Sequence, residues 1–314
     1  MSTPIRVSHH LWETPEITHV NRLDMHSCLI PFAEAEDALV GDREHSRWFA
    51  DLNGQWRFRL FPHPDRVPAE CLQTDCADDG WDGIAVPSNW TLQGFSDKPV
   101  YTNVKMPWEN QPPLVPEDNP TGVYRTAFQL PENWDGRRVV IHLAGVESYY
   151  ELYLNGTYVG MAKDSRLPSE FDLTAALVPG ENILAVKVVR WSDSSYIEDQ
   201  DHWWMAGIYR DVYLYSTDDV YLEDVFVHAD LEVEAGVGLL HVKSKLGFSR
   251  HADGWPGASG PDSDFTVEAE LFDEDGSSLL SLSSTVSHSY RIDGDRGELK
   301  GHVPGVRPWS AEQP

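Results

Sequence analysis

Three carboxylates lie close together in the segment YIEDQDHWW, residues 196–204. They are Glu198, Asp199 and Asp201. Carboxylate oxygens are the ligands that hard cations prefer. They also accept hydrogen bonds from sugar hydroxyls, while a neighbouring indole offers an apolar face to the C–H side of a sugar ring. The segment predicts either a sugar or hard-cation site, or an acidic surface turn followed by core tryptophans.

Asp199 and Asp201 do not fit the catalytic pair of a glycosidase. A retaining pair lies roughly 5–5.5 Å apart and flanks the bond that is broken. Residues two apart on one strand point to the same side, so these two would not flank a substrate. The sequence also has no glycine-rich phosphate loop after a strand, no G-x-S-x-G elbow and no histidine pair at metal-ligand spacing.

Four of the twelve tryptophans lie in or beside irregular segments and are candidate ligand contacts. They are Trp90, Trp108, Trp203 and Trp204. Tryptophan is buried in most positions of a soluble protein, so a core role stays open for each of them.

Residues 91–121 form a proline-rich segment with six prolines and without the alternating pattern of a strand. Proline lacks the amide donor that a central strand needs, so this density predicts a loop. A loop of about 30 residues in a compact domain is usually functional or disordered. We therefore treat the proline-rich loop as a candidate part of the site.

The elements that must position these residues are strands. Alternating apolar and polar residues, rich in β-branched and aromatic types, predict strands in the first part of the chain. Asn155-Gly156 predicts a type I′ hairpin turn between two of them. The first part is therefore predicted to be a jelly-roll (galactose-binding-like) β-sandwich. The expected strands are 55–60, 124–130, 138–143, 148–154, 157–161, 183–189 and 208–215.

A second all-β domain is expected after a break near residues 216–219. Short strands with turn signals between them are typical of an immunoglobulin-like sandwich. The expected strands are 220–228, 239–245, 265–272 and 279–286. The last 14 residues are rich in turn-forming types, and we predict no closing strand among them. We therefore expect this domain to be incomplete and the polypeptide to continue. The predicted organisation is an arm at 1–50, a jelly roll at 51–217 and an incomplete immunoglobulin-like domain at 218–314.

Charge and cysteine usage narrow the class of protein. Against 24 basic residues stand 51 acidic ones, giving a formal net charge of −27. Such a surface repels phosphate, so nucleic-acid and membrane partners are not expected. No run approaches ~18 apolar residues and no secretory signal is visible. Three cysteines without metal-type spacing predict reduced thiols and a cytoplasmic location.

Several motifs together resemble the large β-galactosidases of glycoside hydrolase family 2. They are WETPEITHVNRL near the start, VPSNW (86–90), YTNV (101–104), NPTGVY (119–124), KDSRLPSEFDLT (163–174) and RWSDSSYIEDQDHWWMAGIYRDV (190–212). The resemblance extends in order through PWSAEQP at 308–314.

The resemblance implies a five-domain enzyme with a catalytic (β/α)₈ barrel. This chain would supply the jelly roll and most of the first immunoglobulin-like domain. Both catalytic glutamates of the family lie in the barrel, so the resemblance implies no catalytic residue in this chain. It also implies a homo-oligomer, with the N-terminal arm in the subunit-contact region.

Two site residues follow from the resemblance. Asn103 of YTNV matches an asparagine that reaches into the galactose pocket. Asp201, the second aspartate of EDQD, matches the residue that contacts galactosyl hydroxyls and binds a sodium ion. An amide both donates to and accepts from hydroxyls, and a carboxylate can bridge a cation and a hydroxyl. The proline-rich loop would then deliver Asn103 to the pocket.

A structural magnesium site of relatives does not carry over. Its positions match Leu11, Thr14, Lys163 and Asp193, where leucine has no ligand atom and lysine brings a positive charge. We predict that this metal is absent and that the Lys163 ammonium pairs with Asp193 in its place. Sodium and magnesium are still expected in the complete enzyme, the latter on ligands outside this chain. His202 and Trp204 also depart from the family pattern.

Two function classes remain open from the sequence. The first is the N-terminal segment of a retaining β-galactosidase that cleaves terminal β-D-galactose from lactose-like substrates. The second is a free-standing, non-catalytic carbohydrate-binding module. Galactose binding by this chain alone and the mass of the native polypeptide separate the two.

Overall fold

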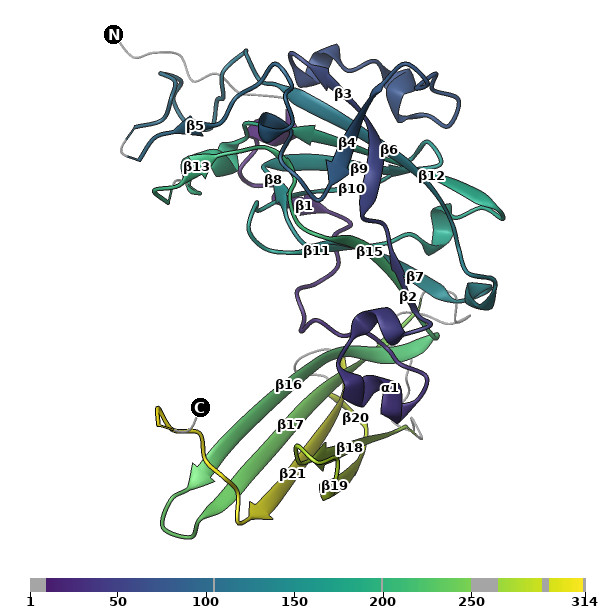
Figure 1. Ribbon diagram of the computed structural model, residues 1–314, viewed down its shortest axis with the longest axis vertical. Helices are drawn as coiled ribbons and strands as arrows, with labels where there is room; N and C mark the ends of the chain where they lie inside the picture. Colours follow the sequence, from purple (N-terminus) through teal and green to yellow (C-terminus); the bar gives the residue numbers. More distant parts are fainter. Residues whose placement is uncertain (1–9, 104, 199, 250–264, 290–293, 313–314) are drawn as a thin grey trace. The chain divides into compact units, whose positions relative to one another are not determined.

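The computed structural model describes residues 10–103, 105–198, 200–249, 265–289 and 294–312 (Figure 1). The chain divides into two compact units. Unit 1 comprises Met1–Asp24 and Arg47–Ser216, and unit 2 comprises Met25–Ser46 and Thr217–Pro314. The segment expected to form an N-terminal arm thus contributes to both units.

Unit 1 is a sandwich of two antiparallel sheets. The larger sheet has, in spatial order, β1 (His19–Val20), β10 (Thr157–Lys163), β9 (Tyr149–Leu154), β12 (Glu181–Val189), β6 (Thr121–Gln129), β3 (Gly54–Phe61) and β4 (Asp82–Val86). The smaller sheet has β11 (Ser169–Asp172), β7 (Arg138–Leu143), β15 (Val212–Thr217) and β2 (Phe49–Asp51). Two short ribbons accompany them: β5 (Val100–Tyr101) with β13 (Trp203–Trp204), and β8 (Val146–Glu147) with β14 (Gly207–Ile208).

Alternation along the strands places one apolar face of each sheet in a shared core. In β3, Trp56 and Phe58 are buried while Arg57 and Arg59 are exposed. Residues of the smaller sheet, such as Ile141, belong to the same cluster of buried side chains. This arrangement confirms the prediction of an all-β sandwich.

The hairpin between β9 and β10 turns at Asn155 and Gly156, as predicted. Both residues have positive φ, 52° and 77°, as a type I′ turn requires. The Asn155 side chain also ties the turn to neighbouring backbone. Its oxygen accepts from the Ile183 amide at 2.9 Å, and its amide group donates to the Ala176 carbonyl at 2.9 Å.

Unit 2 is a second, smaller β-sandwich. Its sheet has the order β16 (Val220–Glu232), β17 (Val237–Phe248), β21 (Gly294–Pro304) and β20 (Ser287–Ser289), and a hairpin pairs β18 (Thr266–Phe272) with β19 (Ser278–Thr285). Val242 and Leu299 from the sheet share a buried cluster with Val267 from the hairpin.

One α-helix and eight 3₁₀ turns complete the described elements. The helix α1 spans Ala35–Val40, within the segment expected to form the N-terminal arm. The 3₁₀ turns are η1 (Leu11–Glu13), η2 (Arg43–His45), η3 (Pro64–Arg66), η4 (Ala69–Leu72), η5 (Trp90–Leu92), η6 (Glu132–Trp134), η7 (Thr174–Ala176) and η8 (Asp193–Tyr196). Within the described part of the chain, no helix is long and apolar enough to cross a membrane.

Two strand predictions were wrong. The expected strand 208–215 is interrupted, since β14 ends at Ile208 and β15 begins at Val212. The expected absence of a strand near the end of the chain is also wrong, because β21 continues to Pro304 and pairs with β17. The glycines of β21 have low strand propensity, so the strand was not predicted, but they allow neighbouring side chains to pack closely. A Cβ on Gly301 would lie 2.5 Å from a methyl carbon of Leu280.

Candidate functional site

The short ribbon of β5 and β13 joins the proline-rich loop to the acidic segment. Tyr101 lies opposite Trp203, and Val100 lies opposite Trp204. The loop and the segment are about 100 residues apart in sequence, and this pairing brings their two candidate residues, Asn103 and Asp201, to one place.

Asp201 lies at the surface and accepts two side-chain hydrogen bonds. The Tyr101 hydroxyl donates to Oδ1 at 2.6 Å, and the Asn103 side chain also hydrogen-bonds the carboxylate. These two bonds, the Tyr101 bond first, hold the pKa of Asp201 below its usual value. Asp201 has φ 52°, a left-handed conformation that aspartate tolerates better than most residues. The site therefore holds an exposed, ionised carboxylate beside an amide.

Glu198, the other described carboxylate of the acidic segment, does not join Asp201. Glu198 accepts from the Ser165 amide at 3.1 Å and from the Ser165 hydroxyl. Burial raises the pKa of Glu198. Asp199 lies outside the described residues. Among the described residues, no group of three acidic, histidine or cysteine side chains is arranged to hold a metal ion.

A hydrogen-bond network around the buried Glu147 fixes the turn that carries Asp201. The Glu147 carboxylate is 2% exposed, accepts from the Met205 amide at 3.1 Å and pairs with Arg166 at 3.2 Å. Arg166 also lies 3.1 Å from Nε2 of His202. His202 contacts the Glu198 carbonyl at 3.2 Å, so it braces the turn from inside. Burial raises the pKa of Glu147, against the opposing effect of Arg166.

Of the four candidate tryptophans, Trp203 is the exposed one. Its side chain is 56% exposed and its ring lies 5.7 Å from that of Tyr101. Trp90 and Trp204 are buried, at 0% and 1% exposure. The Trp108 indole donates to the Tyr196 hydroxyl at 2.8 Å. The core alternative therefore holds for Trp90 and Trp204.

Polar anchors hold the proline-rich loop at both ends. At its start, Arg190 forms a close ion pair with Asp97 and donates to the Lys98 carbonyl at 2.8 Å. Further on, the Tyr196 hydroxyl donates to the Leu114 carbonyl at 2.6 Å. The Val115 amide donates to Glu13 at 2.9 Å. The loop is thus fixed although β5 is the single strand that lies wholly within its described residues.

The predicted pairing of Lys163 with Asp193 is confirmed. Nζ of Lys163 lies 2.7 Å from Oδ2 of Asp193, and each side chain is 4% exposed. Nζ also donates to the Thr14 carbonyl at 3.0 Å. A protonated lysine cannot ligate a metal and Leu11 offers no donor, so these residues do not fit the magnesium set of the relatives.

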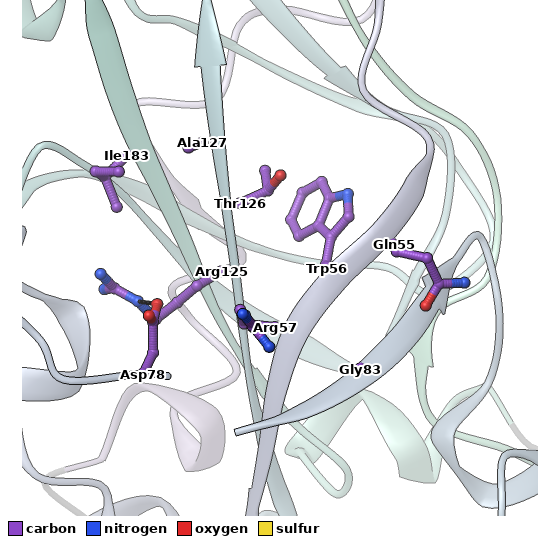
Figure 2. A pocket seen from close by; sticks show the side chains of 9 residues that line it. All are labelled: Gln55, Trp56, Arg57, Asp78, Gly83, Arg125, Thr126, Ala127 and Ile183. Carbon is purple, nitrogen blue, oxygen red and sulfur yellow. Dashed lines mark hydrogen bonds and ion pairs between the residues drawn. The ribbon is translucent and has the colours of Figure 1, made fainter. Parts of the chain in front are cut away.

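A pocket of about 460 Å³ lies elsewhere on unit 1, over the outer face of β3, β4, β6 and β12 (Figure 2). Asn103 and Asp201 do not line it. Arg125 in this pocket is engaged, because its guanidinium donates to Asp78 at 2.7 Å and to the Cys71 and Gln73 carbonyls. The Arg125 cation in this pocket is therefore already paired, and the pocket lies apart from the candidate site.

Tyr101→Phe should raise the pKa of Asp201 towards the ordinary aspartate value. The substitution removes the hydroxyl whose bond most favours the charged carboxylate. Asp201 would then be protonated at higher pH, so any binding that needs its charge would fail at higher pH than in the wild type. Carboxyl NMR titration measures this, with Tyr158→Phe on β10 as the control. An unchanged Asp201 titration would contradict the assignment.

Sequence reasoning missed the residues that support the site. Tyr101 was part of a recognised motif but had no role assigned, and the two-residue strand that positions it has no periodic signal. Glu147 could have been noticed as a charged residue in a predominantly apolar stretch, GVESYYELYL (145–154). Nothing local identifies Arg190 as a loop anchor, because its partner is 93 residues away.

Comparisons with known proteins find relatives over most of this chain. The chain is 42% identical over 308 residues to a β-galactosidase of Psychromonas ingrahamii, covering 96% of this chain and 28% of the relative. It is 46% identical over 239 residues to a β-galactosidase of Pseudoalteromonas haloplanktis, covering 75% of this chain and 22% of the relative. The chain thus spans less than a third of the length of these curated relatives.

Solved structures show the same fold at lower identity. A β-glucuronidase of Bifidobacterium dentium superposes with a TM-score of 0.61 at 17% identity, over 84% of this chain and 43% of that chain. A β-glycosidase of Bacteroides vulgatus gives a TM-score of 0.59 at 19% identity, covering 84% of this chain and 30% of that chain. The family model of the glycosyl hydrolases family 2 sugar binding domain matches residues 49–218. Because that match covers more than half of the sequence, this chain belongs to glycosyl hydrolase family 2.

Proposed function

We propose that this chain is the N-terminal segment of a retaining β-galactosidase that hydrolyses terminal β-D-galactose in lactose-like substrates. Support comes from relatives named β-galactosidase at about 40% identity over nearly the whole chain. The observation that carries the proposal for this site is the meeting of Asn103 and Asp201 beside Tyr101.

In this proposal, Asp201 serves both the sugar and a sodium ion. An ionised carboxylate has about four acceptor positions, so the bonds from Tyr101 and Asn103 leave room for a cation and a sugar hydroxyl. Sodium is a hard cation for which such oxygens are suitable ligands. The Asn103 amide, fixed by its bond to Asp201, would donate to or accept from a second hydroxyl.

The chemical step would be performed outside this chain. A retaining glycosidase uses two carboxylic acids about 5–5.5 Å apart, one as nucleophile and one as acid and base. We assign both to glutamates of a (β/α)₈ barrel, together with the magnesium ligands. The complete enzyme would be a cytoplasmic homo-oligomer. This chain would contribute the positioning of galactose, which raises the rate by fixing the reacting bond between the two acids.

The complete polypeptide tests the proposal. It should hydrolyse a nitrophenyl β-D-galactoside far faster than the matching β-D-glucuronide, in sodium buffer. Equal rates, a preference for the glucuronide or no hydrolysis would contradict it. Galactose titration onto the 314-residue chain distinguishes the enzyme segment from the free-standing module. If the chain supplies only part of the pocket, it should bind galactose far more weakly than the complete protein does. Equal affinities of the two would favour the free-standing module.

A further inference from the structure

The ammonium of Lys163 joins three segments that are far apart in sequence. Lys163 ends β10, Thr14 follows η1, and Asp193 begins η8. Nζ contacts the Asp193 carboxylate at 2.7 Å and the Thr14 carbonyl at 3.0 Å. Both charged side chains are almost fully buried. We call this set of three residues the ammonium junction.

The surroundings of the junction are anionic. Glu16 lies close enough to act electrostatically on Lys163, and Glu13 on Asp193. Burial lowers the pKa of Lys163 and raises the pKa of Asp193, and the contact between the two side chains opposes both shifts. A carboxylate that is buried without a compensating cation is strongly unfavourable, so this place requires a positive charge of some kind.

The two elements that the junction connects also hold the proline-rich loop. Glu13 of η1 accepts from the Val115 amide at 2.9 Å. Tyr196 of η8 donates to the carbonyl of the preceding residue, Leu114, at 2.6 Å. The same place in the loop is therefore fixed from two sides, and Lys163 links the two supports.

We propose that the Lys163 ammonium is a built-in cation that stands in place of a divalent metal and positions the two supports of the proline-rich loop. An ammonium needs few acceptors, whereas Mg²⁺ requires an octahedral set of oxygens that leucine at position 11 cannot help to supply. Unit 1 then folds and holds its loop without any divalent cation. This inference does not depend on the proposed hydrolase activity.

Thermal unfolding of the full chain tests the built-in cation. The midpoint of the wild type should be the same in EDTA and in millimolar Mg²⁺ or Ca²⁺. Lys163→Gln should lower the midpoint by about 10 °C in EDTA, because Asp193 loses its partner. Mg²⁺ or Ca²⁺ should restore part of that loss, since the variant offers the carboxylate, an amide oxygen and the Thr14 carbonyl to the ion.

Lys187→Gln is the matched control. Lys187 is also largely buried on the same sheet, 3.5 Å from Glu151. Glu151 keeps hydrogen bonds from the Tyr149 and Tyr153 hydroxyls at 2.9 Å each. Divalent cations should therefore not change the unfolding midpoint of Lys187→Gln. A wild type whose midpoint falls in EDTA, or a folded Lys163→Gln variant that ignores divalent cations, would overturn the inference.

Hydrogen exchange at the Val115 amide tests the positioning role. Exchange should be faster in Lys163→Gln in EDTA, slower again with Mg²⁺ or Ca²⁺, and unchanged in Lys187→Gln. If Lys163→Gln does not fold, Lys163→Met/Asp193→Leu removes both charges together. This double variant should fold, ignore divalent cations and exchange the Val115 amide faster than the wild type. Wild-type exchange in the double variant would overturn the positioning role.

Discussion

Asp201→Asn in the complete enzyme should lower kcat/KM for galactosides by about 10- to 100-fold, the loss expected for a hydrogen bond to a charged group. The amide keeps the size and shape of the carboxylate, so the fold should be unaffected at this exposed position. What is lost is the negative charge, and with it the affinity for sodium. KM should rise, because the galactosyl hydroxyls lose both an acceptor and the cation beside it.

A sodium titration at constant ionic strength, with potassium as the replacement ion, distinguishes this loss from a general defect. Wild-type activity should increase with sodium, and Asp201→Asn activity should not. Asp135→Asn is the matched control, since Asp135 is also exposed but follows η6, far along the chain from the site. If Asp201→Asn keeps the sodium response of the wild type, Asp201 is not the ligand.

Arg190→Met should destabilise unit 1 by about 3–5 kcal/mol, the effect expected when a buried ion pair loses one partner. The guanidinium pairs with Asp97, donates to the Lys98 carbonyl and lies 4.6 Å from the Trp191 ring centre. The side chains of Arg190 and Asp97 are 3% and 9% exposed. Methionine fills much of the space but leaves the carboxylate with one remaining side-chain donor, the Trp90 indole at 2.8 Å.

Urea unfolding gives the free energy of this change. Arg190→Met/Asp97→Leu should recover a large part of the loss, because no buried charge is then left alone. Arg59→Met, at an exposed position on the outer face of β3, should change the free energy of unfolding by less than about 0.5 kcal/mol. A double variant as unstable as Arg190→Met would show that packing of the arginine, rather than its charge, is responsible.

Most of the fold could be predicted because strand alternation is a local property of sequence. The strand 138–143 and the turn at Asn155 and Gly156 have their expected bounds. The failures occur where tertiary packing overrides propensity. Gly297 and Gly301 weaken the strand signal of β21, yet a Cβ at Gly297 would lie 2.8 Å from the Ser244 hydroxyl of β17, and one at Gly301 would lie 2.5 Å from Leu280 of β19. Such a requirement comes from a neighbour and is invisible in the strand itself.

The candidate site was predictable only through family resemblance. No periodicity connects Asn103 to Asp201, and the two-residue strands that join their segments are too short to be recognised. The local reading of a three-carboxylate cation site fails because Glu198 turns inward to Ser165. The pairing of Lys163 with Asp193 was likewise predicted through the resemblance, which matches both residues to one site of the relatives, and it is favourable because a buried carboxylate needs a positive partner.

The anchors of the proline-rich loop mark out the segment whose sequence can be varied against a fixed scaffold. Asp97 at one end and Val115 at the other are bound by side chains of the scaffold, Arg190 and Glu13. Between these anchors, Tyr101 and Asn103 contact Asp201 and Trp108 packs on Trp191, so only the remaining positions can be varied without changing the site or its packing. A library built in this loop should therefore keep both anchors, together with Tyr101, Asn103 and Trp108, as they are.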